Sequence, residues 1–190
     1  MHYKETAQAG NSYLHLWDVA SEKAFDGGFL LTTTSFPAGT EIVPKGTFLR
    51  GDLVNRTAVP VKTVVLAAAV LTTDTEVKIK KGHNLIATDK IGTATASVTV
   101  GTIDTSDDDY DVITIVADAL GALADGAVLQ SHDASGVIVP NGLLHRDVEI
   151  DDETPCSIVF RADGIVTSRL PQPVSPAIET ALKDCQFLNI

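Results

Sequence analysis

The stretch from Phe36 to Val65 most constrains what this chain can fold into. It contains two turns of one kind, Pro37–Gly39 and Pro44–Gly46. In each, a proline with a fixed φ stands two residues before a glycine that tolerates positive φ. A short β-favouring run follows each turn, and we expect a third turn at Gly51–Asp52 and a branched strand over 61–66. Such a stretch predicts a turn-rich β unit that offers backbone edges and loops rather than a reactive pocket.

The rest of the chain predicts the same class of fold, mainly β with few short helices. Val77–Lys80 alternates apolar and basic residues, which is typical of a strand with one solvated face. We expect one helical stretch at 117–124, and a terminal helix over 176–183 with Ser175 as its N-cap and Pro176 in its first turn. Further short strands are expected at 40–43, 47–50, 94–100, 112–116, 127–129, 137–139, 148–150, 157–160 and 165–166.

We divide the chain into three parts. Residues 1–35 are predicted to be an extended N-terminal arm, because they contain too few spaced apolar residues to form a core. Residues 36–130 are predicted to form the β core. Residues 131–190 are predicted to be a C-terminal β extension with the terminal helix, or to continue the core as one domain.

Charge and cysteine content restrict the partners and the compartment. The net charge of −11 argues against nucleic acid and against an anionic membrane, since both need clustered lysine and arginine. Cys156 and Cys185 are too few for a disulfide framework, and we interpret them as thiols of a chain made in a reducing compartment. The N-terminus has no apolar signal segment, and the longest apolar run is too short to cross a bilayer.

The sequence contains no pattern that points to catalysis. No two histidines stand four residues apart, and no nucleophile elbow or phosphate-binding loop is present, so we expect no enzyme activity, no metal and no cofactor. The acidic run 104–111 lacks the ligand order of a calcium loop, and we interpret it as a solvated turn. Arg50–Asp52 and the Asn55–Thr57 sequon are likewise interpreted as turns.

The order of the glycine turns resembles a known family. Pro37-x-Gly39-Thr40, Pro44-Lys-Gly46-Thr47-x-Leu49 and Pro60-Val-Lys62-Thr63 resemble the core of tailed-phage head decoration and head-fibre proteins. The segments 77–83, 91–92 and 110–129 fit the same type, so the resemblance covers about 36–130.

This resemblance implies a β-tulip-like barrel or clip that sits as a homotrimer on the major capsid protein. The chain would then be a virion structural protein, made in the host cytoplasm and carried on the outer capsid surface, which stabilises the shell or serves as a head-fibre base. We expect the arm to add a strand to a capsid subunit, with Tyr13, Leu14, Leu16 and Trp17 as interface residues.

An alternative reading is a glycan-binding β-clip module. The string 42–53 also resembles the small β-clip modules of antifreeze-like and sialic-acid-related proteins. Under this reading, exposed aromatic side chains would contact the sugar, and a host-surface glycan would be the ligand.

Overall fold

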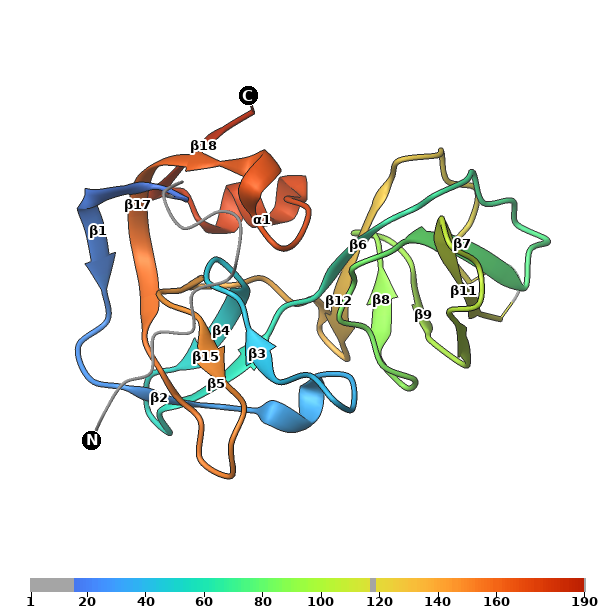
Figure 1. Cartoon of the computed structure of the whole chain (residues 1–190). Coiled ribbons are helices and arrows are strands. Elements are labelled where there is room, and N and C mark those ends of the chain that lie inside the picture. The colour runs from blue at the N-terminus through green and yellow to red at the C-terminus, as the bar shows by residue number, and fades with distance from the viewer. Residues whose placement is uncertain (1–15, 117–118, 190) are drawn as a thin grey trace.

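The computed structural model describes residues 16–116 and 119–189 of this chain. It confirms a mainly β fold, with 42% strand and 7% helix. The strands form two lobes that lie side by side (Figure 1). The terminal lobe comprises residues 16–61 and 138–189, and the inserted lobe comprises residues 62–137.

The terminal lobe is built on an eight-stranded sheet in the order β1-β17-β14-β4-β5-β2-β16, with β18 also paired to β17. A separate pair, β15 and β3, the helix α1 and two 3₁₀ turns complete it. The bounds are β1 (Asp18–Ala24), β2 (Phe29–Leu31), η1 (Thr33–Ser35), β3 (Ile42–Val43), β4 (Phe48–Asp52), β5 (Thr57–Pro60), β14 (Gly142–Leu144), β15 (Val148–Glu149), β16 (Pro155–Cys156), β17 (Ile158–Val166), η2 (Thr167–Arg169), α1 (Pro176–Ala181) and β18 (Cys185–Leu188).

The inserted lobe contains a three-stranded sheet, β10-β11-β7, and a five-stranded sheet, β13-β12-β8-β9 with β6 beside β12. The chain enters this lobe at β6 and leaves it after β13. The bounds are β6 (Thr63–Val65), β7 (Glu76–Lys80), β8 (Lys90–Gly92), β9 (Ser97–Thr99), β10 (Ile103–Asp104), β11 (Tyr110–Thr114), β12 (Val128–Asp133) and β13 (Gly136–Val137).

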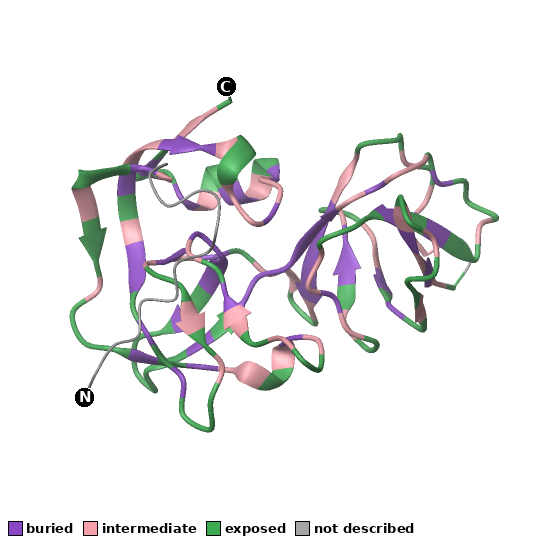
Figure 2. Ribbon diagram, in the orientation of Figure 1, coloured by how far each residue is buried: buried purple, intermediate pink, exposed green. Residues whose placement is uncertain are grey.

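Each lobe has its own hydrophobic interior, and buried positions run through both (Figure 2). The inserted lobe packs residues such as Leu66, Ile79 and Leu129 into one cluster. The terminal lobe has two clusters, one around Phe48 and one around Phe29. Each cluster draws its side chains from one lobe, so each lobe has a hydrophobic core of its own.

The two predicted Pro-x-Gly turns are confirmed. Gly39 and Gly46 both have φ +85. Thr40 donates from its backbone N and its Oγ1 to the carbonyl of Pro37, and Thr47 does the same to Pro44. The repeated sequence therefore forms two turns with the same hydrogen-bond pattern.

Other local predictions agree with the structure. β7 alternates exposed and buried residues as predicted. The α1 helix begins after Ser175, whose side chain accepts a hydrogen bond from the backbone N of Ile178 at 3.2 Å. Both features depend on neighbouring residues, so a local pattern is sufficient to predict them.

Three local predictions are wrong. The separate strands expected at 157–160 and 165–166 are one strand, β17, which continues through Gly164. Residues 119–124 form no helix among the described part of 117–124. The chain also does not turn at Gly51–Asp52, because β4 continues to Asp52. Gly51 is buried there, and a Cβ on it would lie 2.6 Å from Cδ1 of Ile158, so this glycine serves close packing rather than a turn.

The predicted division into arm, core and extension does not match the strand pairing. β2 and β5, from the predicted arm and core, pair with each other, and β14 and β17 from the predicted extension complete the same sheet. The region 36–130 is thus shared between two lobes. Trp17 is 2% exposed, and Phe29 is buried with it in the terminal lobe, so the described part of 1–35 is built into the fold instead of forming an arm.

Cys156 and Cys185 are free thiols, and both are buried. Burial raises the pKa of each to about 11, which keeps them protonated and unreactive at neutral pH. Among the described residues, no helix has the length and apolar character needed to cross a membrane.

Candidate functional site

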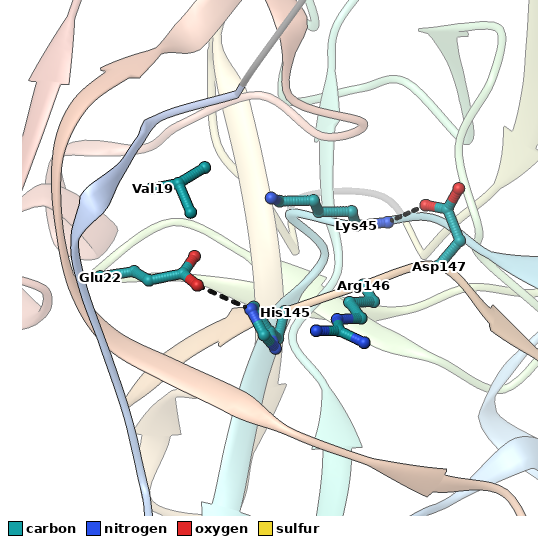
Figure 3. Close-up of a pocket in the computed structure, with 6 residues that line it drawn as sticks. All are labelled: Val19, Glu22, Lys45, His145, Arg146 and Asp147. Atoms are coloured by element: carbon teal, nitrogen blue, oxygen red, sulfur yellow. Dashed lines mark hydrogen bonds and ion pairs between the residues drawn. The ribbon is translucent and has the colours of Figure 1, made fainter. Parts of the chain in front are cut away.

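A shallow pocket of about 370 Å³ in the terminal lobe brings together charged side chains from three segments. Figure 3 shows how they face one another across it. β1 contributes one wall, the Pro44–Thr47 turn a second, and the segment after β14 a third. The lining residues are Val19, Glu22, Lys45, His145, Arg146 and Asp147.

Glu22 is at the centre of the hydrogen bonding. Its Oε1 lies 2.9 Å from Nε2 of His145, and its Oε2 accepts a hydrogen bond of 2.9 Å from Nε1 of Trp17. Burial alone would raise the pKa of Glu22, but the bonds from Trp17 and His145 outweigh it and hold this pKa below its ordinary value. An ionised carboxylate can only accept, so Nε2 of His145 carries the proton in this pair.

Lys45 closes the pocket over the indole. Its Nζ lies 4.1 Å from the centre of the Trp17 ring, which is a cation–π contact. Its backbone N donates to Oδ1 of Asp147 at 2.6 Å. Burial lowers the pKa of Lys45, and the charges of Glu22 and Asp147 oppose that shift.

The pocket contains charged side chains, but few of its groups could take part in a reaction. The proton on Nε2 leaves Nδ1 of His145 as an acceptor, and such a pair can take a proton from a bound hydroxyl. Among the described residues that line the pocket, none is a serine, threonine or cysteine that it could activate as a nucleophile. The observed bonds instead fasten β1 and Trp17 to the rest of the terminal lobe.

A second polar cluster lies in the inserted lobe beside its boundary with the terminal lobe. The buried Nζ of Lys62 contacts Oδ2 of Asp89 at 2.5 Å; burial lowers the pKa of Lys62 and this contact opposes the shift. Asp111, also buried, lies 2.7 Å from Nζ of Lys81 and 3.0 Å from Nε2 of His83. Among the described residues, no group of three or more acidic, histidine or cysteine side chains is arranged to hold a metal ion.

The acidic run is divided by the fold. Asp104 is exposed and Asp107 is partly exposed, and they accept hydrogen bonds from the backbone N of Ser106 and Asp109, as expected of a polar turn. Asp111 instead points inward and pairs with Lys81. The interpretation as a solvated turn therefore applies to the exposed aspartates and not to Asp111.

The predicted interface residues do not form one exposed surface. Tyr13 and Leu14 lie outside the described residues. Leu16 is partly buried, and its carbonyl accepts from Val166. Trp17 is fully inside the terminal lobe, so it is not available in this conformation to a capsid subunit or for stacking on a sugar.

Sequence reasoning missed the pocket residues. Glu22 and His145 are 123 positions apart, and Lys45 belongs to a turn that the sequence explained by its glycine. No motif links residues at such separations, so only the fold brings them together.

Comparison with protein-family models, with curated proteins and with solved structures finds no match for this chain. The resemblance to phage decoration proteins therefore rests on the turn pattern alone.

Proposed function

We propose that this chain is a virion structural protein that decorates the outer surface of a capsid. It would bind the major capsid protein as a homotrimer and stabilise the shell, or form the base of a head fibre. The observation that carries the proposal is the pair of Pro-x-Gly-Thr turns. Pro37-x-Gly39-Thr40 and Pro44-Lys-Gly46-Thr47, which are part of the string that resembles decoration proteins, form these turns with the same φ and the same hydrogen bonds.

The use of charged groups supports the same proposal. Glu22, Lys45 and His145 are engaged in holding β1 and Trp17.

Both ends of the large sheet are protected as well. β1 carries a bulge and three charged residues, and β16 is two residues long and begins with proline. Protected edges suit a protein that is present in many copies and must not polymerise through its strands.

Purified virions of the virus that encodes this chain provide the test. An antibody against the full chain should label their outer surface, and mass spectrometry should find the chain at a fixed ratio to the major capsid protein. Light scattering of the purified chain, or of the chain released from shells, should give three times the chain mass of 20.0 kDa. A chain that is abundant in infected cells but missing from gradient-purified virions would refute the proposal.

A further inference from the structure

One face of the terminal-lobe sheet presents a cluster of exposed apolar side chains. Half of the exposed large hydrophobic residues of the described chain lie here, and we call them the outer patch: Leu30, Leu53, Val54 and Val59. Their exposed fractions are 45%, 50%, 89% and 36%. A cluster of this kind, unlike scattered single residues, marks an interaction surface.

The strand register places these residues together. In β2 and β5 the exposed and buried positions alternate, so Leu30 and Val59 point away from the core. Leu30 is paired with Thr57, which in turn pairs with Asp52 at the end of β4. Leu53 and Val54 lie in the turn that joins the end of β4 at Asp52 to the start of β5 at Thr57.

The turn is held firmly. Oδ1 of Asp52 accepts hydrogen bonds from the backbone N of Val54 at 2.8 Å and of Asn55 at 3.0 Å, and Oδ2 accepts from Nδ2 of Asn55 at 2.7 Å. Arg56, at φ +55, donates to the carbonyl of Asp26 and lies over the Phe29 ring. The two apolar side chains are therefore presented in a pre-organised turn, which lowers the entropic cost of binding.

The surroundings of the patch are acidic. Exposed carboxylates flank it on the turn, on the connection between β1 and β2, and on the segment that leads into β16, whose Pro155 pairs with Leu30. They are Asp26, Asp52, Asp151, Asp152 and Glu153. Two cations lie nearby: Arg50 pairs with the carboxylate of Asp133, and Arg56 donates to the backbone carbonyl of Asp26, so the five flanking carboxylates outnumber the cations.

The acidic surroundings of the outer patch favour one kind of binding partner. A second copy of the chain would bring acidic surroundings against acidic surroundings, at a net charge of −11 for each chain. A partner with an apolar centre and a rim of lysine and arginine would meet no such repulsion.

We propose that the outer patch docks this chain onto a protein surface that is apolar at its centre and basic at its rim. The inference rests on the proposed function, under which that surface belongs to the major capsid protein. The contact with the shell would then be the outer patch and not the predicted interface residues Leu16 and Trp17, which are partly or fully buried.

The test is co-sedimentation of the full-length protein with shells assembled from the major capsid protein. Val54→Asp and Leu30→Thr alter exposed side chains, so both variants should fold. Each should reduce the bound copies about ten-fold or more, the effect of losing a central apolar contact. The matched control is Leu71→Asp, which makes the same type of change at a 61% exposed residue of the inserted lobe and should bind as the native chain does.

The acidic rim is tested separately. The double variant Asp152→Lys/Glu153→Lys should bind shells more weakly, and its binding should depend less on salt than that of the native chain. Light scattering should show one oligomeric state for the native chain and all variants.

The outcomes separate the two proposals. If the native chain binds shells and the patch variants bind equally well, or Leu71→Asp is equally impaired, the patch is not the contact and only this inference fails. If the patch variants change the oligomeric state, the occupant is a second copy and the inference fails. If the native chain does not bind shells at all, the proposed function and the inference both fail.

Discussion

At the residue scale, the hydrogen bonding of His83 depends on its protonation state. Nδ1 accepts from the backbone N of Leu85 at 3.1 Å, so the proton is on Nε2, which lies 3.0 Å from Oδ2 of Asp111 but off the line of a hydrogen bond. Burial lowers the pKa of His83; Asp111 opposes this shift, and Lys62 and Lys81 add to it. A charged imidazole has two donors, so protonation would also remove the acceptor for Leu85.

This geometry predicts a loss of stability on acidification. The folded-state pKa is below the value of 6.5 expected for the unfolded chain, so between these values the unfolded state binds more protons. The stability that neutral His83 contributes to the folded state is complete above pH 6.5, and it is lost as the pH falls from 6.5 through the folded-state pKa. His83→Asn keeps an acceptor for Leu85 and does not titrate, so its urea midpoint should fall less between pH 7 and pH 5.5 than that of the native chain. Parallel curves for the two proteins would contradict this prediction.

At the element scale, Ser175 links the start of α1 to the inserted lobe. Its Oγ accepts from Ile178 and donates to Oε1 of Gln130, whose Nε2 donates to the carbonyl of Ile138 at 2.7 Å. Ser175→Ala should cost about 1 kcal/mol for the cap and about 1–3 kcal/mol for the unpaired buried oxygen of Gln130. Ser175→Gly is the matched variant, because glycine is tolerated as an N-cap and only the second loss remains. Equal urea midpoints for the two variants would show that the cap contributes nothing.

Elements were predictable where neighbouring residues define them. Ser175-Pro176 predicted α1, and the alternation at Val77–Lys80 predicted β7. The continuation of β4 through Gly51 was not predictable, because its causes lie far away in the sequence. The side chain of Asn141 pairs with both the N and the O of Gly51 at 2.8 Å, and Ile158 fills the space that a side chain would need. The candidate pocket and the lobe boundaries depend on similar long-range pairings, which no spacing in the sequence reveals.

At the scale of the whole molecule, buried polar side chains join the two lobes. Thr63 Oγ1 donates to the carbonyl of Pro173 at 2.7 Å, and Gln172 Nε2 donates to Oδ1 of Asn84 at 3.4 Å. Separating the lobes would exchange each of these bonds for bonds to water, at a net cost of about 0.5–1.5 kcal/mol per bond. The contacts therefore couple the unfolding of one lobe to that of the other.

We expect the native chain to unfold in urea in one transition. Trp17, the one tryptophan, reports on the terminal lobe alone, whereas far-ultraviolet circular dichroism reports on both lobes. The two signals should coincide in the native chain. In Thr63→Val/Asn84→Ala both contacts with the 172–173 segment are lost, so the lobes should unfold separately and the two curves should diverge. Arg50→Ala is the control, because it breaks an exposed ion pair to Asp133 that also spans the lobes, and exposed pairs contribute little. Coincident curves in the double variant would mean that the Thr63 and Asn84 contacts are not what couples the lobes, and that the remaining contacts, such as Ser175 with Gln130, are sufficient.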